Sequence, residues 1–189
     1  MTMREILIIP IGTNYIKKSI MNAVSSYIME FYSIFGFSVR VLPGLRIDIE
    51  HFVKGYNEVR RQFLGRVFIP VLQDIRERFN AEAVLGIANV DLYEDNLNFI
   101  FGLADPYSRV AIISLYRLNP EFYGDFPNEW LLGERSIKEA MHELGHVFGL
   151  AHCPNPKCVM HFSNSISDTD YKEKDYCRMC RKKLEEELK

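Results

Sequence analysis

The stretch HELGHVFGLAHCPNPKC, residues 142–158, places three histidines, a glutamate and two cysteines within one short run. Neutral imidazole and thiolate are both good zinc ligands. His142 and His146 are four residues apart, so on a helix both rings project from one face, as a shared metal ion requires. Gly149 allows the chain to turn, and His152 can then return as a third ligand. The run predicts a metal site and restricts the chain to folds that can build one.

Three nitrogen ligands leave the fourth position of a tetrahedral zinc ion open, which is typical of catalytic sites. Glu143, beside the first histidine, is directed to the side of the metal and is free to hold a water molecule. Zinc lowers the pKa of a bound water from roughly 16 to about 7. Glu143 can accept the proton of that water and deliver it to a leaving amine. The pattern therefore predicts hydrolysis with Glu143 as general base.

The other two histidines are not expected to be metal ligands, and two alternative functions stay open. His51 lies in the polar stretch DIEHFVKG and is expected to be solvated, whereas His161 is expected to be a neighbour of the metal rather than a ligand. One alternative function is a zinc-binding regulatory or interaction protein without turnover. The other is hydrolysis of a non-peptide amide by the same chemistry. Glu143 favours peptide hydrolysis, because metal binding alone does not require it.

The four cysteines of the chain indicate a second metal site. Cys153 and Cys158 form one pair, and Cys177 and Cys180, expected on one helical turn, form another, in a spacing typical of structural zinc. Four thiolates fill the tetrahedron, so this metal would bind no substrate. Two disulfides are the alternative. The N-terminus lacks a signal-peptide layout, which favours a reducing cytoplasm and hence zinc.

The bulk composition is that of an ordinary globular protein. The chain has 189 residues, 48% hydrophobic and 25% charged, with a formal net charge of −2, so one compact domain is expected and no nucleic-acid partner is indicated. No apolar run approaches the roughly 20 residues of a membrane span. We expect a cytoplasmic monomer that acts on a peptide or protein substrate.

Basic residues crowd the segment around the last two cysteines, and acidic residues 185–187 follow almost at once. This favours a solvated helix face, or cations that offset the thiolate charge, over a nucleic-acid surface. The basic residues are Lys172, Lys174, Arg178, Arg181, Lys182 and Lys183.

Hydrophobic periodicity predicts alternating strands and helices before the metal motif. Strands are expected over 4–12, 36–44, 81–93, 98–106 and 109–118, the last two as a hairpin-like pair. Helices are expected over 17–35 and 56–79, the second kinked or split at Pro70. Ser136, with Glu139 as capping-box partner, predicts the start of a helix that ends near Gly149. A last helix is expected over about 170–188, and the whole is an α+β fold with a mixed sheet.

The sequence HELGHVFGLAH resembles the extended zinc-binding motif of the metzincin metallopeptidases, and the cysteines resemble one branch, the archaemetzincins. In that pattern Cys153 directly follows the third histidine, Cys158 and Met160 come next, and the pair in YCRMC closes it. The gap between Met160 and Cys177 is 16 residues, one shorter than the family pattern. The resemblance continues upstream through NVDLY, NFIFGLAD and AIISLYRL.

The resemblance implies a metzincin-type zincin fold with a small, zinc-stapled C-terminal subdomain. Residues 1–149 would form an upper subdomain with the mixed sheet and the active-site helix, and residues 150–189 the lower one. Met160 would form the Met-turn, an apolar floor beneath the three histidines.

The resemblance also implies an activity, that of a zinc metallopeptidase with two Zn²⁺ ions, one catalytic and one structural. An antiparallel edge strand at about 99–104 would pair with extended substrate by strand addition. Phe101, Gly102 and Leu103 would then be the substrate-binding residues.

Overall fold

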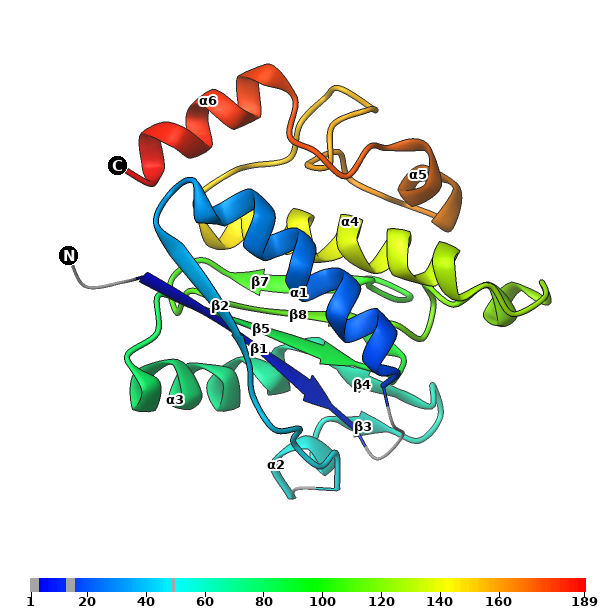
Figure 1. Ribbon diagram of the computed structural model, residues 1–189. Coiled ribbons are helices and arrows are strands. Elements are labelled where there is room, and N and C mark those ends of the chain that lie inside the picture. Colours follow the sequence, from blue (N-terminus) through cyan, green and yellow to red (C-terminus); the bar gives the residue numbers. More distant parts are fainter. Residues whose placement is uncertain (1–3, 13–15, 49) are drawn as a thin grey trace.

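The computed structural model describes residues 4–12, 16–48 and 50–189 (Figure 1). Its main element is a five-stranded sheet with the strand order β2-β1-β5-β8-β7. The strands are β1 (Arg4–Ile11), β2 (Phe37–Val41), β5 (Ala83–Ala88), β7 (Gly102–Asp105) and β8 (Val110–Ser114). Only the β7–β8 pair is antiparallel within this sheet. The predicted α+β class with a mixed sheet, and the hairpin-like pair, are confirmed.

Helices cover both faces of the sheet. Helices α1 (Lys18–Ser33) and α4 (Glu129–Val147) contact each other on one face, and α3 (Ile69–Phe79) packs on the other (Figure 1). Every residue of β5 and β8 is buried, which explains their continuous apolar sequences, because a strand covered on both faces has no solvated side. This double-sided core fixes α4 above β7 and β8.

The helix expected over 56–79 is wrong in its first half. A small second sheet takes its place, with strands β3 (Tyr56–Asn57), β4 (Gln62–Leu64) and β6 (Leu92–Tyr93). Between this sheet and α3 lies the short 3₁₀ helix η1 (Gly65–Phe68), and α2 (Glu50–Val53) precedes β3. Pro70 lies in the first turn of α3, where its missing N–H costs no helical hydrogen bond. Pro70 therefore starts a helix rather than kinking one. The strand expected over 81–93 is also shorter than predicted, because its last residues form β6 in the second sheet and only β5 belongs to the main sheet.

Helix α4 starts about two turns earlier than the sequence predicts. Asn128 is its N-cap, and its side chain accepts a hydrogen bond from the Leu131 N–H at 3.0 Å. Ser136 is buried within the helix, and its hydroxyl donates to the Leu132 carbonyl at 2.6 Å. The end near Gly149 is as predicted, since α4 closes at Val147 and Gly149 has a φ of +89°.

The segment after Gly149 lies on the side of α4 away from the sheet (Figure 1). It contains α5 (Ile166–Tyr171) and α6 (Arg178–Glu187), so the single helix expected over 170–188 is wrong. Ser165 and Asp168 form a capping box that starts α5 early, and the chain is extended at Lys172. Val159, Met160 and Leu184 of this segment join the core cluster that contains α1 and α4.

None of the helices in the described ranges is both long and apolar enough to cross a membrane. The expected cytoplasmic location and monomeric state stay predictions.

Candidate metal centres and active site

Helix α4 and the turn after it bring three histidines together. His142 and His146 are one turn apart on α4, and the turn at Gly149 returns His152 to them. The ring centroids of His142 and His146 are 4.7 Å apart, and those of His146 and His152 also 4.7 Å. One ring nitrogen from each of the three lies within 4.8 Å of the others. The structure therefore brings together all three predicted ligands.

The backbone fixes the tautomers of two of these rings. Nδ1 of His142 lies 2.7 Å from the carbonyl oxygen of Val159, and Nδ1 of His146 lies 2.7 Å from that of Leu150. A carbonyl only accepts, so both Nδ1 atoms carry hydrogen and both Nε2 atoms carry lone pairs. The two Nε2 atoms are 3.1 Å apart, and two lone pairs repel at this distance. A cation between them removes the repulsion, so the donor set fits a zinc ion.

Burial keeps these rings neutral. It lowers the pKa of His142 well below the usual range, with the positive charge of Lys172 adding to the effect. It also lowers the pKa of His146 and of His152, which is more exposed. Neutral imidazole is the form that binds metal, so the environment favours ligation.

Glu143 lies beside His142 in a cavity of about 220 Å³. Its side chain is buried, and burial together with the nearby carboxylate of Glu139 raises its pKa well above the usual carboxyl range, although Lys172 opposes this. A raised pKa makes the carboxylate a stronger base, which suits it to accept a proton and later release it.

The cavity walls come from β7 and its approach, from α4, and from the segment after Met160. They are formed by Leu97, Asn98, Phe99, Ile100, Phe101, Gly102, Glu139, His142, Glu143, Phe162, Ser163, Asn164 and Lys172. Two of the three expected substrate residues, Phe101 and Gly102, are among them. Leu103 packs instead with the core cluster on the α3 face of the sheet.

Sequence reasoning missed an ion pair in this cavity. Nζ of Lys172 lies 3.1 Å from Oε1 of Glu139, and the two side chains are 0% and 4% exposed. Glu139 is therefore not the capping-box partner that we expected. Lys172 pairs with it, and Lys174 pairs with Glu134 of α4, so neither serves as a cation of a solvated helix face. The partners are more than thirty residues apart in sequence, and no local pattern indicates the pairing.

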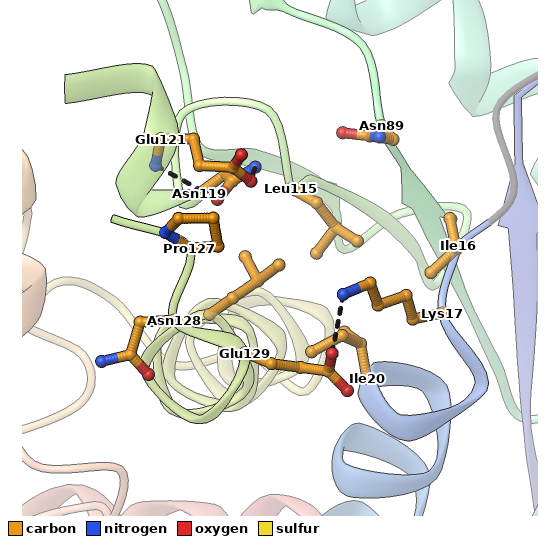
Figure 2. Close-up of a pocket in the computed structure, with 11 residues that line it drawn as sticks. Ile16, Lys17, Ile20, Asn89, Leu115, Asn119, Glu121, Pro127, Asn128 and Glu129 are labelled. Atoms are coloured by element: carbon orange, nitrogen blue, oxygen red, sulfur yellow. Dashed lines mark hydrogen bonds and ion pairs between the residues drawn. The ribbon is translucent and has the colours of Figure 1, made fainter. Parts of the chain in front are cut away.

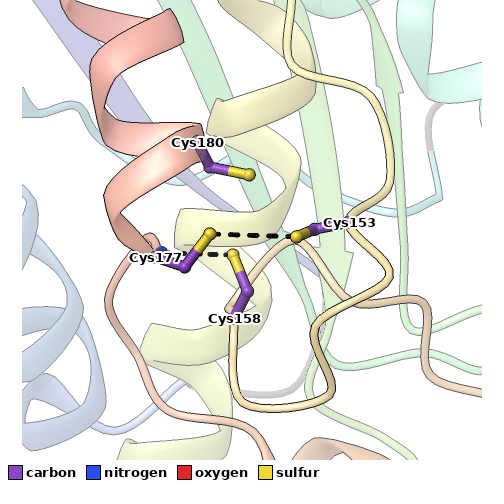
Figure 3. A group of neighbouring side chains, drawn as sticks. All are labelled: Cys153, Cys158, Cys177 and Cys180. Carbon is purple, nitrogen blue, oxygen red and sulfur yellow. Dashed lines mark hydrogen bonds between the residues drawn. The ribbon is translucent and has the colours of Figure 1, made fainter.

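The four cysteines form a second cluster (Figure 3). All are free, and their Sγ atoms lie within 4.8 Å of one another. Cys177 is the N-cap residue of α6 and Cys180 lies in the first turn of that helix, and the Cys177 N–H donates to Sγ of Cys158 at 3.3 Å. Burial alone would raise the pKa of Cys177, but hydrogen bonds from the Cys180 N–H and from the other thiols lower it to about 7. The four-sulfur arrangement fits a tetrahedral metal better than two disulfides.

Met160 and His161 follow Cys158 in the chain. The side chain of Met160 is fully buried, and a Cβ atom added to Gly145 of α4 would collide with its Sδ, so Met160 packs directly against the helix that carries the histidines. Nδ1 of His161 donates to the carbonyl of Cys153 at 2.9 Å. His51 is exposed, lies in α2, and bonds through Nε2 to the Val67 carbonyl at 2.8 Å.

A further cavity of about 140 Å³ lies away from both clusters, near the ends of β5 and β8 (Figure 2). Asn89 and Leu115, the residues directly after these strands, line it, and Lys17 donates to Glu129 at 2.7 Å. The Lys17–Glu129 ion pair links the N-terminal ends of α1 and α4 at this cavity.

Comparison with known proteins gives a consistent result over nearly the whole chain. Residues 3–186 match the model of a family described as Peptidase family M54. An archaemetzincin from Pyrococcus abyssi is 56% identical over 186 residues, which is 98% of this chain and 97% of that protein. An archaemetzincin from Methanocaldococcus jannaschii is 47% identical over 160 residues, 83% of this chain and 82% of that protein.

Two solved structures are similar to the whole fold. The crystal structure of an archaemetzincin from Methanopyrus kandleri has a TM-score of 0.81 at 33% identity, covering 99% of this chain and 97% of that chain. The structure of an archaemetzincin from Archaeoglobus fulgidus, complexed with malonate, has a TM-score of 0.72 at 33% identity, covering 95% and 99%.

Proposed function

The chain belongs to peptidase family M54, the archaemetzincins, and is a zinc metallopeptidase; from this premise we propose that Glu143 is its general base and that three histidines hold its catalytic zinc. The ligands would be Nε2 of His142 and His146 and a ring nitrogen of His152. The observation that carries the proposal is the convergence of these nitrogens beside the buried carboxyl of Glu143 in one cavity.

The proposed mechanism assigns a separate task to each group. Zinc bound by the three rings would polarise the scissile carbonyl and make water a better nucleophile. Glu143 accepts the proton of the attacking water and delivers it to the leaving amine. The Val159 and Leu150 carbonyls hold the His142 and His146 rings in the metal-binding tautomer, which also raises their basicity.

We propose that the substrate binds as an extended strand along β7. This strand pairs with β8 on one side and lies at the edge of the sheet, where its other edge can receive a peptide. Gly102 at its start lies against Glu143, so a peptide on this edge would pass directly over the general base. Phe101 and Gly102 are the contacts we propose there, and Leu103 would contribute through its backbone only.

The cysteine cluster supports a second, structural zinc held by Cys153, Cys158, Cys177 and Cys180. With four thiolates no ligand position would be left for substrate. We also propose that the chain divides at Gly149 into an upper subdomain, 1–149, and a lower one, 150–189. The position of α5 and α6 across α4 from the sheet supports this division (Figure 1), with Met160 as the Met-turn beneath the histidines.

The decisive experiment is Glu143→Gln, with Glu30→Gln on the exposed face of α1 as matched control. Zinc content and cleavage of a broad peptide library are measured on both and on the wild type. We expect Glu143→Gln to keep its zinc and to lose hydrolysis by at least about a thousandfold, while Glu30→Gln behaves as wild type. Cleavage that survives in Glu143→Gln would refute the assignment. Activity only on N-acyl compounds would instead favour hydrolysis of a non-peptide amide. If no substrate were turned over, a regulatory or binding role would be favoured.

A further inference from the structure

We propose that the substrate cleft continues past the start of β7 over an aromatic row, and that this row binds apolar or aromatic residues on the C-terminal side of the cleaved bond. The row consists of Phe99, Arg117 and Phe122, with Tyr116 and Tyr123 at its outer end. The proposal rests on the peptidase function proposed above, and it assigns a substrate class. The preferred substrates are chains that extend several residues beyond the cleaved bond.

The row begins inside the catalytic cavity. Phe99 and Phe101 line the same cavity as His142 and Glu143, with their ring centroids 5.1 Å apart in an edge-to-face contact. The guanidinium carbon of Arg117 lies 4.5 Å from the centre of the Phe99 ring. The row is therefore continuous with the site of chemistry.

Arg117 carries the row outward. The same guanidinium lies 4.8 Å from the ring centre of Phe122 in the 3₁₀ helix η2 (Pro120–Tyr123), so it is stacked between two phenyl rings. The Phe122 ring contacts Tyr116 at 5.4 Å and Tyr123 at 5.0 Å between centroids. These last three side chains are exposed, at 40%, 43% and 40% respectively. A connected group of exposed aromatic rings marks a binding surface more often than an isolated one does.

The row is rigid and electrically neutral. Nε and Nη2 of Arg117 donate to the two carboxylate oxygens of Asp91 at 2.6 and 2.8 Å, and Asp91 is itself nearly buried. The Tyr123 hydroxyl donates to the Arg117 carbonyl at 2.8 Å. Because the Asp91 carboxylate neutralises the positive charge of Arg117, the surface favours apolar or aromatic groups of a substrate over acidic ones. Because the rings are held in place, little side-chain entropy is lost when a peptide binds.

The direction of β7 decides which part of a substrate reaches the row. The Ser114 N–H donates to the Phe101 carbonyl at 2.8 Å, so residues that follow β8, including Arg117, lie beside the approach to β7. A peptide that is antiparallel to β7 runs from Asp105 toward Phe99. Its residues after the cleaved bond therefore leave the cavity over the row. At about 3.3 Å per extended residue, the ring of Phe122 is reached roughly three residues beyond the bond.

The test uses peptides that share one sequence up to the cleaved bond and differ after it. One set ends three residues later with Phe, Ser or Asp at the third position, and one peptide ends after a single residue. Wild type is compared with Phe122→Ala, with the conservative Phe122→Tyr, and with Phe79→Ala as matched control. Phe79 is 42% exposed at the end of α3 on the other face of the sheet, and the Arg40 guanidinium lies 5.3 Å from its ring centre.

We expect wild type to cleave the Phe peptide about tenfold more efficiently than the Ser or Asp peptide, mainly through KM. Phe122→Ala should lose this preference, whereas Phe122→Tyr and Phe79→Ala should keep it. A preference that survives in Phe122→Ala, or no preference in the wild type, would overturn the proposal.

A binding measurement separates this proposal from the peptidase function. The same peptides are titrated into zinc-loaded Glu143→Gln with and without Phe122→Ala. If the wild type cleaves none of these peptides, but in Glu143→Gln the Phe peptide binds more tightly and loses that advantage when Phe122→Ala is added, the row is supported and the peptidase function fails. Equal binding of the Phe, Ser and Asp peptides overturns the row whether or not cleavage occurs.

Discussion

Gly102 at the start of β7 lies so close to Glu143 of α4 that a Cβ atom on Gly102 would be 2.6 Å from Oε1 and 2.7 Å from Cγ of Glu143. The absence of a side chain at position 102 is therefore what allows the proposed general base to lie beside the edge strand. Glu143 is buried and cannot move aside cheaply.

Gly102→Ala is expected to displace the Glu143 carboxyl and to lower kcat by at least about tenfold, because a general base must be within hydrogen-bond reach of its proton. Zinc content should be unchanged, since the histidines are not touched. Steady-state kinetics and metal analysis on the same sample check this. Wild-type kcat in the variant would show that Glu143 does not need this position.

Gly133→Ala is the opposite case on the same helix. A Cβ atom there would make only ordinary contacts, 3.9 Å from Cδ1 of Ile20 and 4.0 Å from Cβ of Ala23. Alanine in a helix interior is favoured over glycine by about 0.5–1 kcal/mol, so this variant should unfold at a higher urea concentration with unchanged kcat. A destabilised variant would mean that α1 and α4 are closer than these contacts indicate.

The metal motif was predictable from sequence because its information is local. His142, His146 and Gly149 define a helix face and a turn by spacing alone, and the structure brings His152 to them. The start of α4 was not predictable in the same way, because Asn128 and Ser136 both have side chains suited to an N-cap. Burial decided between them, since Ser136 lies in the core and bonds within the helix.

Contacts between distant segments account for the other differences. Glu139 fits a capping box by spacing, but Lys172 reaches it from the far side of α4. Similarly, Phe99, Arg117 and Phe122 are ordinary residues in sequence and form a row only because β8 returns beside the approach to β7. No periodicity carries information of this kind.

The buried pair of Glu139 and Lys172 gives a stability prediction. Lys172→Met would leave the Glu139 carboxylate buried without its partner and should lower the free energy of unfolding by about 3 kcal/mol. The double variant Glu139→Leu with Lys172→Met removes both charges and should recover most of this loss. Urea titration of the four proteins of the cycle measures the coupling. A double variant as unstable as Lys172→Met alone would show that packing, not charge, dominates.

Two buried tyrosines predict loss of stability at alkaline pH. The Tyr176 hydroxyl donates to the Met141 carbonyl at 2.6 Å, so the Tyr32 hydroxyl, 2.9 Å away, donates to Tyr176. Burial raises the pKa of both phenols above the usual value near 10. The folded protein then keeps protons that the unfolded chain releases, so stability is complete below about pH 10 and falls as pH rises toward the folded-state pKa.

Urea midpoints between about pH 8 and 11 measure this effect. Tyr32→Phe removes one hydrogen bond, which should cost about 1 kcal/mol at neutral pH. It also removes one titrating group, so the alkaline loss should be shallower by up to about 1.4 kcal/mol per pH unit. Tyr107→Phe, at a side chain that is 99% exposed, should match wild type. An unchanged alkaline slope in Tyr32→Phe would show that other groups cause the loss.

The junction of His152 and Cys153 predicts that the two proposed metals are coupled. The Cys153 N–H donates to the Met160 carbonyl at 2.9 Å, and the Sγ atoms of Cys153 and Cys177 are 3.8 Å apart, so a metal on the cysteines would hold the backbone that carries His152. Wild type should contain two zinc ions per chain and Cys177→Ser one. Cys153→Ser should lose the structural zinc and should also lower the affinity for the catalytic zinc by about tenfold or more, as loss of a supporting contact does. Metal analysis combined with competition by a chelator separates the two ions. Glu143→Gln is the control that loses activity while it retains its metal. Catalytic-zinc affinity equal to wild type in Cys153→Ser would mean that the two sites are adjacent in sequence but independent.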